Sequence, residues 1–234
     1  MTGRRPLRIL GTLLVIAGVL TLVWAVVVWR WQDPFTALYT TWKQHQLESQ
    51  YDKRVQTFRP AISGGSIAAE RELIAREAKR YRRMSKRGEA IGRIRVPRMG
   101  VDMVLVNGTD HDTLKKGPGR DERTFMPGEN RLVYIAGHRT TYLAPFSHID
   151  RLRAGDRLTI EVPYGTFVYA VTHHRVVKAT DLSVLRSPRH ELVELQACHP
   201  RFFASHRYIA YARLVRVEPR GGKPFELAAQ ASGK

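Results

Sequence analysis

Residues 192–217 read LVELQACHPRFFASHRYIAYARLVRV, which is two apolar runs on either side of a short intervening segment. The runs 192–197 and 208–217 have the length and apolar content of β-strands. Pro200 lies just beyond the first run, and strand pairing should end there because proline cannot donate a hydrogen bond to a sheet. We therefore expect two neighbouring antiparallel strands joined by a loop over residues 199–206.

Further apolar runs with turn residues between them precede this pair. They cover residues 91–96, 101–106, 132–136, 158–162 and 166–177. Short strands separated by glycine-containing turns are typical of an all-β barrel or sandwich. One short helix is expected near residues 145–152. The sequence thus predicts a mainly β domain, to which we assign residues 89–219.

The N-terminal part of the chain has a different character. Residues 9–29, ILGTLLVIAGVLTLVWAVVVW, are 21 residues without a charge, with tryptophans at 24, 29 and 31 near the end of the run. A helix of this length spans about 30 Å, the hydrocarbon thickness of a bilayer, and indole rings suit its interface. A cleaved signal peptide would have a shorter apolar run and a small-residue cleavage site, which WAVVVWRWQ does not offer. We predict a retained single-pass anchor over residues 1–31.

Arginines precede this run at positions 4, 5 and 8 without any acidic residue among them. The positive-inside rule keeps such an end cytoplasmic and sends the rest of the chain outward. The localisation predicted from the sequence is therefore the cell membrane, with the N-terminus cytoplasmic and the β domain extracellular.

The chain is strongly basic, with a net charge of +18. Such a charge favours anionic partners, namely nucleic acid, lipid headgroups or acidic wall polymers. Residues 71–98 contain eleven basic and three acidic residues, and residues 68–84 have the composition of a helix. Both a solvated linker helix and a surface that docks on anionic lipid or wall polymer fit this pattern. No nucleic-acid-binding motif accompanies the charge, so we expect no nucleic-acid partner. We assign residues 32–88 to a stem with a basic helix, and 220–234 to a flexible tail.

Cys198 is the only cysteine, which excludes an intrachain disulfide and multi-cysteine metal sites. At the end of a strand a cysteine can be exposed and rigidly held, but a thiol with a pKa of about 8.5 needs a nearby base or cation to act as a nucleophile. His138 follows the apolar run 132–136, and Arg207 begins the strand that should pair with the cysteine strand. Each residue alone also has a structural interpretation, such as a buried thiol or a surface arginine.

The segments that carry these residues resemble the sortase family of cysteine transpeptidases, most closely its class E members from actinobacteria. Residues 128–146, GENRLVYIAGHRTTYLAPF, are similar to the family's histidine segment. Residues 194–207, ELQACHPRFFASHR, are similar to its cysteine and arginine segment, including the spacing from Cys198 to Arg207. The likeness covers roughly residues 88–217 together with the anchor.

The resemblance implies an eight-stranded β-barrel with Cys198, His138 and Arg207 as catalytic residues around a groove. It also suggests Thr140, Tyr142 and Ala197 as substrate-binding residues. The thiolate would attack the peptide carbonyl after the threonine of an LPXTG- or LAXTG-like sorting signal, and an amine would resolve the acyl-enzyme. The implied partners are secreted proteins with a C-terminal sorting signal, a peptidoglycan precursor or other amine acceptor, and membrane lipid.

Two positions depart from the family pattern. Ala197 stands where relatives usually have threonine, and Leu143 stands where class E members often have glycine. The Leu143 departure leaves the exact sorting motif open. The Ala197 departure, together with the basic stem, leaves open an alternative: a non-catalytic, membrane-anchored wall-binding or scaffold protein on a sortase-like fold.

No cofactor or metal is expected. The histidines lack a chelating spacing such as H-E-x-x-H. A small acidic region could hold calcium, as in some relatives, or consist of solvated loop carboxylates; its members are Asp110, Asp112, Asp121 and Glu122.

Overall fold

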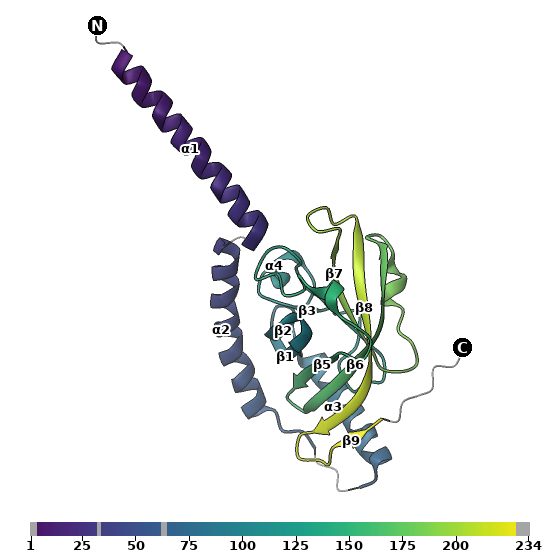
Figure 1. Ribbon diagram of the computed structural model, residues 1–234. Helices are drawn as coiled ribbons and strands as arrows, with labels where there is room; N and C mark the ends of the chain where they lie inside the picture. The colour runs from purple at the N-terminus through teal and green to yellow at the C-terminus, as the bar shows by residue number, and fades with distance from the viewer. Residues whose placement is uncertain (1–3, 32–33, 62–64, 228–234) are drawn as a thin grey trace.

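The computed structural model describes residues 4–31, 34–61 and 65–227. Within these residues, the helices α1 (Arg4–Trp31), α2 (Pro34–Thr57) and α3 (Ile67–Met84) precede the β domain (Figure 1). The strands are β1 (Ala90–Val96), β2 (Val101–Asn107), β3 (Gly119–Arg120), β4 (Leu132–Ala136), β5 (Arg157–Val162), β6 (Gly165–Lys178), β7 (Leu192–His199), β8 (His206–Pro219) and β9 (Phe225–Glu226). Short helices are α4 (His111–Leu114) and the 3-10 turns η1 (Pro97–Met99), η2 (Ile149–Arg151) and η3 (Leu182–Leu185).

The strands form a closed barrel and not a sandwich. Their order is β6-β5-β1-β2-β3-β4-β7-β8, and an antiparallel pairing between β6 and β8 closes the circle of eight strands in the described chain. β9 adds a short edge outside it, next to β8. The predicted mainly β fold is confirmed, and every apolar run named above coincides with a strand. β3 was not predicted because its two residues, a glycine and an arginine, carry no apolar alternation.

β4 lies between β3 and β7 in the barrel wall. All of its residues are buried, and the two strands run parallel, which is typical of strands covered on both faces. Val133 and Ile135 belong to the main core inside the barrel, whereas Leu132, Tyr134 and Ala136 belong to a second apolar cluster outside it. This double burial fixes the register of β4, because a shift by one residue would exchange its two faces.

α3 packs on the barrel and does not stand free in solvent. Ser66 caps its N-terminus by accepting a hydrogen bond from the Ala69 amide. Ile74, Ala78 and Tyr81 lie in the main core, and the Tyr81 hydroxyl donates to the Ile91 carbonyl at 3.0 Å. Part of the predicted stem is therefore built into the folded unit.

α2 covers the outer side of β2. Leu47 and Tyr51 form a small apolar cluster with residues of β1 and β2. The Gln44 side-chain oxygen accepts from the Val104 amide at 2.7 Å, and its nitrogen donates to the Val104 carbonyl at 3.2 Å. β3 pairs with β2 only from Val106 onward, so Gln44 occupies the position that a neighbouring strand would take.

The basic segment 71–98 meets carboxylates that the fold brings from distant parts of the chain. Arg82 pairs with Glu129 at 2.7 Å, and Arg98 with Asp156 at 3.0 Å. Arg95 pairs with Glu161 at 3.0 Å. These pairs reduce the free positive charge that the local sequence suggests.

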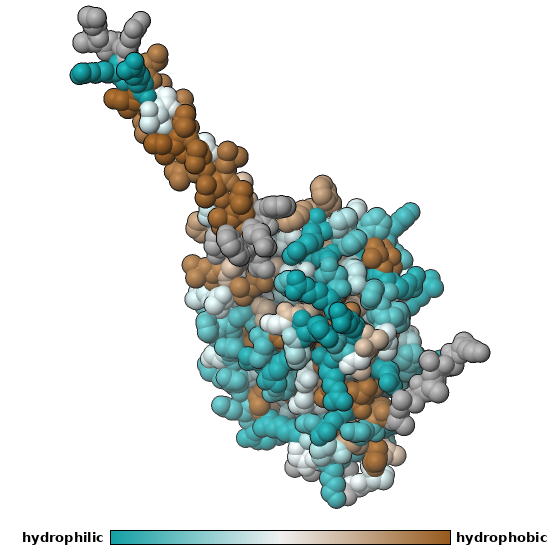
Figure 2. Space-filling view, viewed as in Figure 1, coloured by the Kyte–Doolittle hydropathy of each residue, from teal (hydrophilic) through white to brown (hydrophobic). Residues whose placement is uncertain are grey.

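α1 extends away from the barrel (Figures 1 and 2). Its segment Arg5–Val27 has a mean hydropathy of 2.5, and none of it is buried against the rest of the protein. By length and composition this helix can cross a membrane. Trp24 lies near the end of this segment, while the side chains of Trp29 and Trp31 lie outside the described part of the structure. At the other end of the chain, Phe225 and Glu226 of the predicted tail form β9, and residues 228–234 lie outside the described residues.

Candidate active site

β7 and β8 bring Cys198 and Arg207 together. The antiparallel register pairs Cys198 directly with Arg207, and His199 with His206 forms the last pair before the loop. Side chains of directly opposed residues point to the same face of a sheet. Cys198 is half-buried and is a free thiol.

β4 places His138 beside this pair. The parallel register joins Ala136 to Gln196, and the Gly137 amide donates to the Gln196 carbonyl at 3.0 Å. His138 therefore leaves the sheet at the level of Cys198. Gly137 is required here because a Cβ atom would lie 2.8 Å from the Phe146 ring.

Cys198, His138 and Arg207 line one open groove with a volume of about 260 Å³. Its floor includes Gln196 of β7 and Tyr134 of β4, and the segment between β6 and β7 forms a wall. The side chain of Ala197 points away from this groove, into the barrel core. Its side chain is fully buried in the main core, so any contact of Ala197 with a ligand in the groove would involve its backbone.

The His138 imidazole is largely enclosed. Its Nε2 atom is buried and has no hydrogen-bond partner within the described chain, and its ring lies 5.0 Å from the Tyr142 ring centroid. Burial lowers the pKa of His138 below its ordinary value, because an enclosed site disfavours the charged ring. At neutral pH the imidazole is therefore neutral and able to accept a proton.

Arg207 is held at the end of the β7–β8 loop. Its Nη1 atom donates to the Ala204 carbonyl at 2.7 Å and to the His206 carbonyl at 3.0 Å. These bonds fix the planar cation in the groove, where it can stabilise an anion.

Arg139 was not singled out from the sequence, yet it joins the histidine and cysteine segments. It is only 4% exposed, and its Nη1 atom donates to the Cys198 carbonyl at 3.2 Å and contacts His199 Nδ1 at 2.9 Å. Its Nη2 atom forms an ion pair with Asp150 at 3.1 Å. The one sequence signal for Arg139 is its position next to His138, because Cys198 and His199 lie about sixty residues further along the chain.

The segment after Arg139 contains the other predicted substrate contacts. Thr140 and Tyr142 are both half-buried. The Tyr142 amide donates to Thr36 Oγ1 of α2 at 3.1 Å, and its ring meets Tyr39 edge-on at 6.5 Å. Leu143 has φ 61°, a left-handed conformation that glycine adopts without strain. The glycine expected here from class E sortases would fit this backbone.

The carboxylates of the small acidic region are engaged in contacts within the protein. Asp121 pairs with Arg123 at 2.7 Å, Glu122 with Arg87 at 2.6 Å and Asp112 with Lys115 at 2.8 Å. Asp110 caps α4 through the Thr113 amide. Among the residues that the structure describes, no three His, Cys, Asp or Glu side chains are grouped so as to hold a metal ion.

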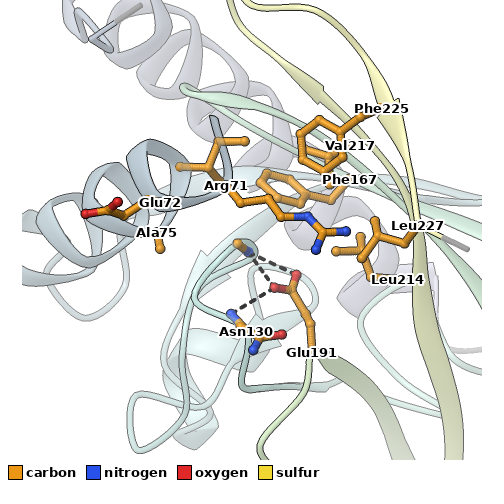
Figure 3. Close-up of a pocket in the computed structure, with 12 residues that line it drawn as sticks. Arg71, Glu72, Ala75, Asn130, Phe167, Glu191, Leu214, Val217, Phe225 and Leu227 are labelled. Carbon is orange, nitrogen blue, oxygen red and sulfur yellow. Dashed lines mark hydrogen bonds between the residues drawn. The ribbon is translucent and has the colours of Figure 1, made fainter. Parts of the chain in front are cut away.

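A second cavity of about 250 Å³ lies between α3 and the β8–β9 edge (Figure 3). Its walls are mainly apolar, and the Arg71 side chain reaches across it toward the Phe225 ring. Glu191 lies at its floor and accepts hydrogen bonds from the Gly128 and Asn130 amides and from the Tyr169 hydroxyl. The described lining contains no cysteine or histidine, so this cavity offers no nucleophile with a base.

Comparisons with known proteins agree with the fold and the groove. Residues 94–215 match the model of the sortase domain. The chain is 33% identical over 133 residues to sortase D of Bacillus subtilis, covering 55% of this chain and 65% of that protein. It is 31% identical over 116 residues to sortase SrtE1 of Streptomyces coelicolor, covering 45% of this chain and 33% of that protein. The match thus spans less than two thirds of the length of these curated relatives.

Solved structures show the same architecture. Sortase E1 from Streptomyces coelicolor, determined with a tripeptide in the active site, is 26% identical and superposes with a TM-score of 0.53, over 57% of this chain and 92% of that chain. Sortase E from Streptomyces avermitilis is 29% identical with a TM-score of 0.51, over 57% of this chain and 93% of that chain. The chain therefore belongs to the sortase family, whose members are cysteine transpeptidases. The family predicted from the sequence is confirmed, and the relatives include both class D and class E proteins.

Proposed function

We propose that this protein is a membrane-anchored transpeptidase. It cleaves an LPXTG- or LAXTG-like sorting signal of a secreted protein and transfers that secreted protein to an amine of the cell wall. The observation that carries the proposal is the groove in which Cys198, paired in register with Arg207, lies beside His138. A nucleophile, a base and a fixed cation in one open groove are the parts that acyl transfer requires.

In the first half-reaction, His138 takes the proton of the Cys198 thiol. The sulfur attacks the carbonyl carbon of the peptide bond after the signal's threonine, and the carbonyl oxygen becomes an oxyanion stabilised by the Arg207 guanidinium. When the intermediate collapses, the C–N bond breaks and the leaving amine takes the proton from the imidazolium. The products are a thioester on Cys198 and the released C-terminal peptide.

In the second half-reaction, an amine of a peptidoglycan precursor attacks the thioester. Its excess proton passes to His138 as the new amide forms, and the proton returns to the sulfur as the C–S bond breaks. Thr140 and Tyr142 are proposed to contact the sorting signal, since they continue the His138 segment. Ala197 would contribute through its backbone, because its side chain lies in the core.

The proposed setting is the outer face of a cell membrane. Residues 1–31 would form the cytoplasmic end and the anchor, residues 32–88 the stem, residues 89–219 the catalytic barrel and residues 220–234 the tail. The apolar span Arg5–Val27 and the arginines at its N-terminal side support this orientation.

The test uses the full chain in lipid nanodiscs with fluorescent LPXTG- and LAXTG-like peptides and an amine acceptor. We expect a new amide product, and an acyl adduct on Cys198 by mass spectrometry when the acceptor is omitted. Cys198→Ala should give neither. A correctly folded wild-type protein without an adduct across a panel of such signals would contradict the proposal and favour the non-catalytic scaffold.

A further inference from the structure

Apolar side chains are exposed on two elements at one end of the barrel. On α2 they are Phe35, Leu38 and Trp42, which are 72%, 72% and 53% exposed. On the β7–β8 loop they are Phe202 and Phe203, which are 61% and 81% exposed. Single exposed apolar residues are common on proteins, but a group of large ones marks an interaction surface.

The α2 residues form one stripe. Positions 35, 38 and 42 follow the spacing that places side chains on one face of a helix. The opposite side of α2 contacts the β domain, since Thr40 donates to the Lys115 carbonyl at 2.8 Å and Leu47 packs on the barrel. The stripe therefore faces away from the protein.

The stripe and the loop belong to elements that adjoin the two segments of the candidate site. α2 reaches the His138 segment through the Tyr142–Thr36 hydrogen bond, and the β7–β8 loop begins after His199, the neighbour of Cys198. Both elements lie at the end of the barrel from which α1 departs (Figure 1). The exposed apolar side chains thus lie on two elements that adjoin the segments carrying His138 and Cys198.

We propose that these two elements dock on the surface of an anionic lipid bilayer and hold the active-site end of the barrel against it. This inference rests on the proposed membrane anchor. The stripe adjoins that anchor: the ring centroids of Phe35 and of Trp24 in α1 lie 5.6 Å apart, and Figure 2 shows apolar surface along α1.

The chemistry of both elements fits the membrane interface. Aromatic rings favour the headgroup level of a bilayer, and basic residues beside them are attracted to anionic lipids. Lys43 lies 4.2 Å from the Trp42 ring centroid, and the exposed Arg201 precedes the two phenylalanines of the loop. A groove held in this way would receive sorting signals at the height where a membrane-anchored substrate leaves the bilayer.

The experiment places a fluorophore on the loop. In the Cys198→Ala background, Phe203→Cys provides a single thiol for an environment-sensitive dye, and Lys223→Cys, an exposed site after β8, is the matched control. The full chain is reconstituted in phosphatidylcholine–phosphatidylglycerol vesicles with or without doxyl-labelled lipid. For the dye at position 203 we expect the emission maximum to shift to the blue and the doxyl-labelled lipid to quench the emission. For the dye at position 223 we expect neither effect.

A second arm measures turnover with Cys198 intact. Phe202→Asn with Phe203→Ser removes both rings, and asparagine tolerates the φ of 76° at position 202. The rate on a soluble signal peptide should be unchanged, whereas the rate on the same peptide tethered to the vesicle should fall.

The outcomes separate the two proposals. Protein that does not float with the vesicles has no anchor, and both the setting and the docking are then wrong. Protein that floats while the dye at 203 stays as hydrated as at 223 refutes the docking alone. A dye that becomes buried only when a signal peptide is added also refutes it, because the loop then covers substrate and not lipid.

Discussion

Arg139 links the two halves of the active site at the level of a single residue. It contributes hydrogen bonds to the Cys198 carbonyl and to His199 while paired with Asp150. Because hydrogen bonds to charged groups are worth about 1.5–3 kcal/mol, we expect Arg139→Met to lower kcat/KM by roughly 10- to 100-fold. Arg157→Met, at an exposed position of β5, is the control and should leave the rate unchanged.

A purely structural role for Arg139 would appear as lost stability without altered chemistry. The rate of Cys198 alkylation as a function of pH distinguishes the two, since a displaced thiol changes its reactivity. An Arg139→Met protein with normal turnover and a normal alkylation profile would show that this residue does not position the cysteine.

His138, the proposed base, leads to an expected response of the enzyme to acid. Its pKa is lowered by burial, so the neutral base persists below the ordinary histidine value of about 6.5. We expect kcat/KM to hold from neutral pH to below this value and then to fall as the imidazole gains a proton. The pH profile of kcat/KM, with an NMR titration of the His138 ring in Cys198→Ala, checks this. An acid limb at or above pH 6.5 would contradict it.

At the scale of elements, α2 completes the sheet edge that β3 is too short to cover. Gln44 satisfies both backbone groups of Val104, and buried groups left without partners cost about 1–3 kcal/mol. We expect Gln44→Ala to lower the free energy of unfolding by that amount, measured by chemical denaturation of the full chain in micelles. Gln46→Ala, on the exposed side of the same helix, should change it little.

The elements also show which parts of the structure could be predicted. The run 132–136 indicated its strand directly, because a strand that is buried on both faces is apolar throughout. α2 was assigned only to a stem, because Leu47 and Tyr51 are too few to reveal a buried face before the barrel is known. The family resemblance led us to expect Cys198, His138 and Arg207 in one groove, and they line one. The contacts of Arg139 could not be predicted, because Cys198 and His199 lie about sixty residues away. The inward direction of Ala197 likewise depends on the register of β7.

At the scale of the whole molecule, buried carboxyl groups make stability depend on pH. Burial raises the pKa of Glu194 to about 8, and one of its oxygens has no partner within the described residues. Burial also raises the pKa of Glu191 to about 7. In the folded state both carboxyl groups keep their protons up to about pH 7 and pH 8, whereas in the unfolded chain they ionise near the ordinary pKa of 4.5. Their contribution to the free energy of unfolding is therefore fully present below pH 4.5. It is lost as the pH rises through 7 and 8, because the unfolded chain ionises more readily.

Glu194→Gln removes one of these ionisations. We expect the variant to gain stability relative to the wild type as the pH increases from 5 to 9, since glutamine stays neutral. Glu226→Gln changes an exposed carboxyl on β9 and is the control. Its stability should depend on pH in the same way as that of the wild type. Thermal unfolding over this pH range provides the measurement, and a constant difference between Glu194→Gln and wild type would contradict the assignment.

The parallel pairing of β4 with β7 has a consequence for how the chain folds. Residues joined by this ladder are sixty positions apart, as with Leu132 and Leu192, and the β6–β8 closure is also non-local. Contacts of such high sequence separation form slowly, because loop-closure entropy must be overcome first. A nascent chain that has emerged only as far as β6 has no cysteine strand, and one that has not closed the ladder has no histidine beside its thiol. The groove that holds Cys198 beside His138 is therefore complete only when the barrel has closed.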